Sequence, residues 1–177
     1  KVTIKTQGRF VVITNHTPDA TIEGDALVVT IPPITTPEEW CAYYGAEPDA
    51  EDPSLVVLFK AVHEDYRSTH GMSYVPGTMP QAPDWDGGEA ECGRGLHFCA
   101  SPLEALQFDT KATRFIACPV SLRTIAIHPQ AEMPSKVKAP GVAAPCYEVD
   151  RTGKPIATAP HITAAHKTPR PSAHDGA

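Results

Sequence analysis

The run Leu55-Val-Val-Leu-Phe-Lys-Ala-Val62 constrains the fold more than any other stretch of the chain. Seven of its eight residues are apolar, and three of them are valines. The run is too short for a typical helix, and its β-branched side chains favour extended backbone. A strand that is apolar at nearly every position belongs inside a sheet. The run therefore predicts a central strand, and the rest of the chain has to supply its neighbours.

Four later segments are predicted strands that could pair with it: residues 96–98, 114–120, 124–127 and 144–149. Pro119 suggests a bulge or an edge position in the second of them. Ser101 and Pro102 are suited to the N-cap and first position of a helix that runs to residue 109. Residues 129–141 are predicted to be a proline-rich loop. We therefore expect residues 55–155 to form an α+β main domain, with a small mixed or antiparallel sheet and one or two helices.

Residues 1–33 predict an N-terminal β-hairpin. Strand-like runs at residues 10–13 and 27–31 flank turn-forming residues at 15–19, and Pro32-Pro33 ends the second run. A further tight turn at Gly24-Asp25 would make a three-stranded meander. An isolated hairpin is only marginally stable in water. We therefore expect this unit to pack on the rest of the chain or on a partner.

Residues 34–54 predict a short aromatic helix followed by an acidic linker. Thr36-Pro37-Glu38-Glu39 is a strong helix start, with an N-cap, a proline at the first position and early acids. An i, i+3, i+4 spacing places three aromatic side chains on one helix face, namely those of Trp40, Tyr43 and Tyr44. That face either docks into the protein's own core or anchors a partner, because Trp and Tyr are common interface hot spots.

The composition narrows the classes of function. The formal net charge of −6 argues against direct binding to duplex DNA, which draws on a surface rich in lysine and arginine. Five cysteines, no visible signal peptide and no apolar run of membrane-spanning length predict a cytoplasmic protein with reduced thiols and no membrane partner. From residue 156 to residue 177 the chain is rich in Pro, Ala and His, which predicts an extended C-terminal arm or tail.

The stretch Cys92-Gly-Arg-Gly-Leu-His-Phe-Cys99 has three interpretations. One is a zinc site, because thiolate and imidazole are common zinc ligands; the candidate ligands are Cys92, His97, Cys99 and Cys118, with His128 as a fifth. A second is a nucleophilic Cys92 or Cys99; its base would be one of His63, His70, His97 and His128. The third is a strand-to-helix turn at the centre of the fold, which needs neither a cofactor nor a catalytic residue. We favour the third, because the cysteine spacing is longer than in common zinc knuckles.

An alternative is an ADP-ribosyltransferase-like enzyme that uses NAD. Arg67-Ser-Thr-His-Gly71, after a strand, and Gly95-Leu-His-Phe98, before a helix, resemble the nicotinamide pocket of that fold. The resemblance implies an early Arg or His that holds nicotinamide and ribose, and a later aromatic residue that stacks on the ring. It also implies a late catalytic glutamate, for which Glu148 is the candidate. The chain has neither of the glycine-rich motifs that cradle nucleotide phosphates, GxGxxG and GxxxxGK[ST].

Several segments together resemble a second family. They are Leu58-Phe-Lys-Ala-Val62, Cys92-Gly-Arg-Gly-Leu-His-Phe98, Ser101-Pro102, Ala105-Leu106 and Arg114-Phe115. They are similar to small domains of actinobacterial temperate phages and prophages. Over roughly residues 1–155 the chain resembles the recombination directionality factors that work with large serine integrases.

That resemblance implies a non-enzymatic function. Such a factor binds an integrase that is already on DNA and switches it from integration to excision by changing how its coiled-coil arms pair. The partner would be a serine integrase in the cytoplasm of the bacterial host, and DNA would be reached only through it. The candidate contact residues are Phe10 and Val12 in the N-terminal strands and Trp40, Tyr43 and Tyr44 in the aromatic helix.

Overall fold

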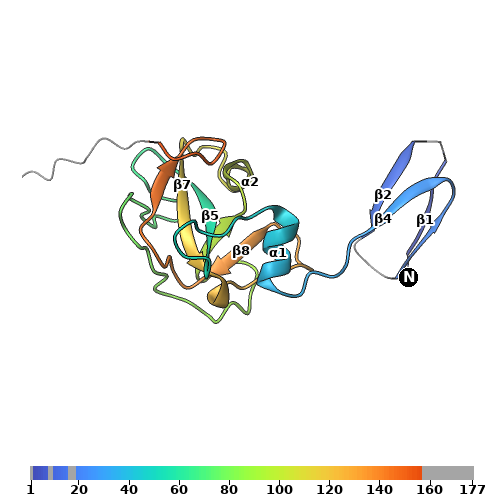
Figure 1. The fold of residues 1–177 in the computed structure, drawn as a ribbon, viewed down its shortest axis with the longest axis horizontal. Helices are drawn as coiled ribbons and strands as arrows, with labels where there is room; N and C mark the ends of the chain where they lie inside the picture. Colours follow the sequence, from blue (N-terminus) through green and yellow to red (C-terminus); the bar gives the residue numbers. More distant parts are fainter. Residues whose placement is uncertain (1, 8–9, 16–18, 157–177) are drawn as a thin grey trace, which may run out of the picture.

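The computed structural model of the chain describes residues 2–7, 10–15 and 19–156 (Figure 1). The predicted tail, apart from Ile156, lies outside the described residues. The main domain holds one antiparallel sheet of five strands in the order β8-β6-β5-β7-β9. The strands are β5 (Leu55–Val62), β6 (Leu96–Cys99), β7 (Arg114–Ser121), β8 (Lys136–Ala139) and β9 (Tyr147–Val149). β5 is central, as predicted, and the combination of this sheet with two helices confirms the α+β class.

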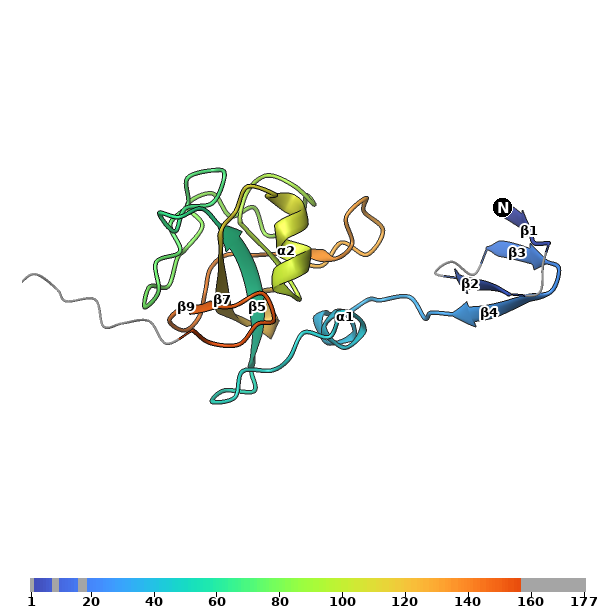
Figure 2. The ribbon, with the colours of Figure 1, turned by 90° about the horizontal axis from the view of Figure 1, so that it is seen from above.

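The two helices serve different apolar layers. α2 (Pro102–Phe108) packs across β5 and β6 on one face of the sheet (Figure 2). Beneath it lies a small cluster that includes Ala105, Phe115 and Val149. α1 (Pro37–Tyr44) belongs to the larger cluster, which also contains buried side chains of β5, β6, β7 and β8. A 3-10 turn, η1 (Leu122–Thr124), follows β7 and touches α1.

Local capping chemistry fixes where both helices begin. Thr36 accepts a hydrogen bond from the Glu39 amide at 3.2 Å, and the Glu39 carboxylate accepts one from the Thr36 amide at 3.1 Å. This reciprocal capping box satisfies amides that the first turn leaves unpaired. Ser101 directly precedes the proline that opens α2, and its hydroxyl accepts a hydrogen bond from the Glu104 amide at 3.2 Å. The helix starts predicted from the sequence are therefore confirmed.

The sheet is weakly joined between β5 and β6. β5 pairs with β7 at eight successive positions, from Leu55↔Ser121 to Val62↔Arg114. With β6 it pairs at Phe59↔Cys99, the one register pair between these two strands in the described chain. β6 is instead paired with β8 at four positions. Beyond the Phe59–Cys99 pair the two strands diverge, which opens a gap in the sheet.

The N-terminal strands do not form the predicted hairpin. β1 (Val2–Lys5) is parallel to β3 (Ala20–Glu23), and β2 (Val11–Asn15) is parallel to β4 (Ala26–Thr30). Consecutive strands thus belong to different two-stranded sheets, and the chain winds through two turns of a flat coil. These strands stand apart from the main sheet in Figures 1 and 2.

Gly24 lies at the corner between β3 and β4, where the chain passes close to Thr6. It adopts φ +114°, in the region that favours glycine, and a Cβ there would lie 2.4 Å from the Thr6 carbonyl oxygen. The corner at Gly24 therefore directs the chain from one small sheet to the other.

Two further predictions differ from the structure. A strand was expected at residues 124–127. In its place the structure has the end of η1, followed by a single β-bridge between Ala126 and Lys138. The expected loop at 129–141 contains β8, whose four residues are all buried. Two of those residues are lysines, so the local sequence looks polar although the strand is internal.

Candidate functional site

The side chains of Val12, Leu27 and Val29 lie exposed on one face of β2 and β4, and we call this surface, together with the exposed Phe10 that directly precedes β2, the outer strand face. Phe10 is 98% exposed, Val12 62% and Leu27 65%. Val12 and Leu27 are register partners, so their side chains lie next to each other, and Val29 lies two residues further along β4. The outer strand face therefore contains two of the predicted contact residues, Phe10 and Val12.

The aromatic face of α1 is largely turned into the protein. Trp40 is 0% exposed, and its indole Nε1 donates a hydrogen bond to the carbonyl oxygen of Pro134 at 2.8 Å. Tyr44 is half-buried, with its ring centroid 5.0 Å from that of Trp40. The prediction of Trp40 as a partner contact is therefore wrong, because the face docks into the core. Tyr43 remains 41% exposed.

A cavity of about 570 Å³ lies in the gap between β5 and β6. Its floor comes from Phe59, Lys60 and Ala61 of β5 and from Leu96 and His97 of β6. Its walls come from α2 and from the loops on either side, and include Ser68, His70, Tyr74, Asp84, Cys92, Ala105, Phe108 and Lys136. The volume lies in the range of small-molecule sites, about 300–1,000 Å³.

Lys60 projects into this gap without an acidic partner. Its Nζ donates a hydrogen bond to the His97 carbonyl oxygen at 3.0 Å and lies 5.9 Å from the centroid of the Tyr74 ring. In the described chain no carboxylate oxygen lies within ion-pair distance of this amine, whereas Lys136 and Lys138 of β8 each have one. Burial has the largest effect on the pKa of Lys60 and lowers it; Cys99, Cys118 and Asp109 raise this pKa, and Lys136 lowers it.

His97 is neutral at physiological pH. Its Nε2 lies 3.3 Å from the Glu91 carbonyl oxygen. Burial, together with the positive charges of Lys60 and Lys136, lowers its pKa to about 4. The imidazole therefore faces the cavity as a hydrogen-bonding group without a charge of its own.

The five candidate zinc ligands are not gathered. Cys118 lies in the core with its sulfur 3.5 Å from that of Cys146, and Cys92 is exposed with its sulfur 2.9 Å from the Lys136 Nζ. No three His, Cys, Asp or Glu side chains of the described residues are placed to share a metal ion. Burial also raises the pKa of Cys99 to about 12, so its thiol is protonated and is a poor nucleophile.

Glu148 lies far from the cavity. It is on β9, and β5 and β7 separate that strand from β6. Its carboxylate accepts hydrogen bonds from Arg114 at 2.8 Å and from the Tyr66 hydroxyl at 3.0 Å. The predicted ADP-ribosyltransferase-like arrangement is therefore only partly assembled. His70, Gly95 and His97 line one cavity, but the proposed catalytic glutamate is not there.

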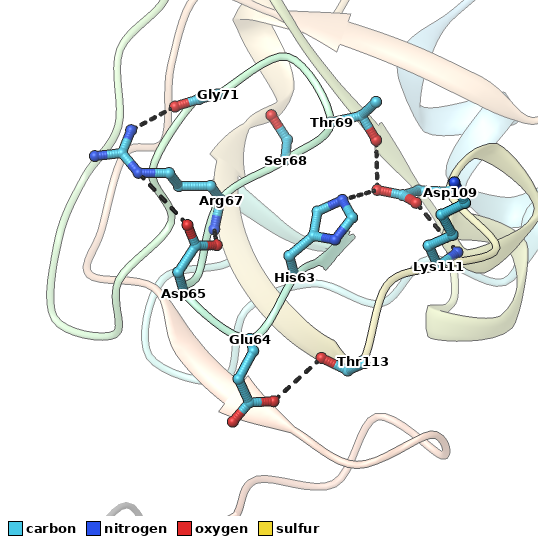
Figure 3. A pocket seen from close by; sticks show the side chains of 10 residues that line it. All are labelled: His63, Glu64, Asp65, Arg67, Ser68, Thr69, Gly71, Asp109, Lys111 and Thr113. Atoms are coloured by element: carbon cyan, nitrogen blue, oxygen red, sulfur yellow. Dashed lines mark hydrogen bonds and ion pairs between the residues drawn. The ribbon is translucent and has the colours of Figure 1, made fainter.

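An open depression lies beside the cavity and shares Ser68, Thr69 and Asp109 with it (Figure 3). Asp109 accepts hydrogen bonds from the Thr69 hydroxyl and, at 3.0 Å, from the His63 Nε2. Burial raises the pKa of Asp109, but these two partners outweigh it and the pKa is lowered overall. Because the carboxylate stands between the imidazole and the hydroxyl, His63 cannot take the Thr69 proton. The group ties the loop after β5 to the end of α2.

Comparison with known proteins gives one match. Residues 56–140 match a domain of unknown function, DUF7666. The DUF7666 match runs from β5 to β8, so it contains the gap between β5 and β6 and the residues of the cavity floor. The outer strand face, α1 and β9 lie outside it. No curated protein and no solved structure matches the chain.

Two observations complete the account of the site. Among the described residues, no helix is both long and apolar enough to cross a membrane. Sequence reasoning missed Lys60 as a site residue, although it is the single charged residue in the apolar run that predicted β5. A charge placed inside a central strand is expensive unless it is used or paired, and that was the available signal.

Proposed function

We propose that this chain is a non-catalytic protein-binding factor whose binding surface is the outer strand face. The observation that supports this most directly is the set of exposed apolar side chains on one face of β2 and β4, together with the almost fully exposed Phe10 just before β2. Contiguous exposed apolar groups are typical of interaction sites. The sequences of the two strands, VVITN and ALVVT, contain no charged residue that would oppose an apolar partner.

Backbone groups add a second means of binding. β2 and β4 form a sheet of only two strands, so each of them has one edge without a strand neighbour in the described chain. An open edge can accept an added strand from a partner, with the backbone supplying affinity and the side-chain face supplying specificity. The outer strand face and these edges belong to the same small unit, so a partner can use both.

The proposed partner is a serine integrase bound to DNA, and the proposed outcome is a switch from integration to excision. The family resemblance of the sequence supports this choice of partner. The net charge of −6 fits a factor that reaches DNA through a protein. The switch requires tighter binding to one of the two integrase arrangements. Converting a 1:99 population into a 99:1 population takes a difference in affinity of about 10⁴-fold.

A recombination assay tests the proposal. The full chain would be added to a serine integrase from the same genome together with its excision substrate, and excised product would be measured. We expect the chain to bind the integrase and to promote excision. A Phe10→Ser, Leu27→Ser double variant should lose both effects. Leu103→Ser should keep both, because Leu103 is also exposed but lies on α2.

Two results would contradict the proposal. The first is that the wild-type chain neither co-purifies with the integrase nor changes the direction of recombination. The second is that the double variant acts as the wild type does. ADP-ribosyl transfer is less well supported, because the carboxylate of Glu148 is bound to Arg114 and Tyr66 away from the cavity.

A further inference from the structure

Three lysines of the main sheet flank β6, Lys60 on β5 and Lys136 and Lys138 on β8, and only the two on β8 have acidic partners. Lys138 is fully buried and contacts both carboxylate oxygens of Asp86, at 3.0 and 3.2 Å. Lys136 lies 3.7 Å from the Glu91 carboxylate. Lys60 has no such partner among the described residues. The group therefore has one positive charge more than its acidic partners balance.

The hydrogen bonds of Lys60 leave its donors underused. An ammonium group carries three N–H donors, and the His97 carbonyl takes one of them. Keeping a poorly hydrated ammonium without a counter-charge is costly, since burial favours its neutral form. An anion bound in the cavity would supply both the missing charge and the missing acceptors.

The other titratable groups that line the cavity do not fill this role. Asp84 accepts a hydrogen bond from the Gly95 amide at 3.1 Å, and Asp109 is held by His63 and Thr69. The remaining ones are His70, Tyr74, Cys92, His97 and Lys136, and none of these is an acid that is ionised at neutral pH. The space beside Lys60 is therefore suited to an anion brought in by a ligand.

The walls indicate what the rest of that ligand is like. Phe59, Tyr74, Leu96 and Phe108 supply aromatic and aliphatic surface, and the Ser68 and Thr69 hydroxyls lie at one side. Aromatic walls bind flat ring systems well. A volume of about 570 Å³ accommodates one ring system together with an anionic group, and leaves no room for a polymer.

We propose that the cavity between β5 and β6 binds a small phosphorylated aromatic molecule, with its phosphate on Lys60 and its ring against the apolar walls. Lys136 also lines the cavity, and its charge is paired with that of Glu91. This site is independent of the proposed protein-binding function, because the outer strand face lies in the N-terminal strands. Failure of either proposal leaves the other standing.

Calorimetric titration of the full chain at low salt tests this inference. The probes are AMP, adenosine and inorganic phosphate. We expect AMP to bind more tightly than phosphate and adenosine to bind weakest, because only AMP has both the anion and the ring. In Lys60→Met the affinity for AMP should fall by about tenfold or more, which is the size of one lost charged contact. Lys154→Met is the matched control, because Lys154 is exposed and lies outside the cavity.

A second measurement guards against a folding artefact. Lys60→Met removes an unpartnered charge but also the donor to the His97 carbonyl, so its melting temperature should stay close to that of the wild type. NMR of the lysine side chains should show that AMP raises the pKa of Lys60 and leaves Lys154 unchanged. The inference is overturned if neither AMP nor phosphate binds at about 10 mM. It is also overturned if adenosine binds as tightly as AMP, or if Lys60→Met binds AMP as the wild type does.

Discussion

Replacing Trp40 tests whether α1 is part of the core or part of an interface. The side chain is completely buried among apolar residues of the main cluster, and its indole N–H satisfies the Pro134 carbonyl. Trp→Ala changes at buried sites cost about 3–5 kcal/mol, through lost apolar contacts and the cavity left behind. The unpaired carbonyl of Pro134 adds about 1 kcal/mol or more, depending on how well water reaches it.

Urea denaturation followed by circular dichroism measures this cost as a change in the free energy of unfolding. In a thermal scan of the same variant, a loss of about 3–5 kcal/mol lowers the melting temperature of a domain of this size by about 10 °C or more. Trp40→Phe keeps most of the apolar contact but loses the hydrogen bond, so it should cost about 1–3 kcal/mol. The control is Tyr43→Ala on the exposed side of the same helix, which should change stability by about 1 kcal/mol or less.

The reasoning is refuted if Trp40→Ala has the same denaturation midpoint as Tyr43→Ala. That result would mean that α1 does not pack on the sheet in solution, and it would restore Trp40 as a candidate partner contact. The opposite outcome has two parts: Trp40→Ala loses much of its stability, and Trp40→Phe binds a partner as tightly as the wild type does. Together these results would place the residue wholly in the core.

Three further predictions concern the N-terminal coil, the cavity and the thiols. Gly24→Ala should disorder the N-terminal strands, seen as faster hydrogen exchange there, while the melting of the main sheet is unchanged; the cause is φ +114° and the 2.4 Å approach to Thr6. Stability should rise with pH between about 4 and 6.5, because the unfolded chain protonates His97 in that window and the folded chain, with a pKa of about 4, does not; in His97→Gln this rise should shrink. In the native protein, iodoacetamide should modify the exposed Cys92 first, and Cys99, whose pKa is about 12, only after unfolding; equal labelling rates would contradict both assignments.

Local signals in the sequence predicted much of the main domain. The apolar run predicted β5 with its observed bounds, because seven apolar residues among eight leave few alternatives to a buried strand. The N-cap residues Thr36 and Ser101, each followed by proline, placed the starts of α1 and α2. These features depend on residues within one turn of each other, and they are readable without knowledge of the fold.

Non-local pairing is what the sequence did not reveal. The N-terminal strands have the alternation expected of a hairpin, and that alternation is the same whether the neighbours are parallel or antiparallel. β8 looked like a loop because Lys136 and Lys138 are polar. Their burial depends on Glu91 and Asp86, more than forty residues earlier in the chain. No local sequence pattern predicts such a distant partner.

Lys60 connects the shape of the sheet with the proposed ligand site. Where the ladder between β5 and β6 ends, its Nζ donates to the His97 carbonyl and thereby bridges the two strands through a side chain. A buried carbonyl that lost a ladder partner would be costly, so this bond helps to keep the gap open. The same amine points its remaining donors at the cavity. In Lys60→Met the gap would lose its polar bridge, and the cavity would lose its unbalanced charge. Binding of AMP and hydrogen exchange of the β6 amides should therefore change together.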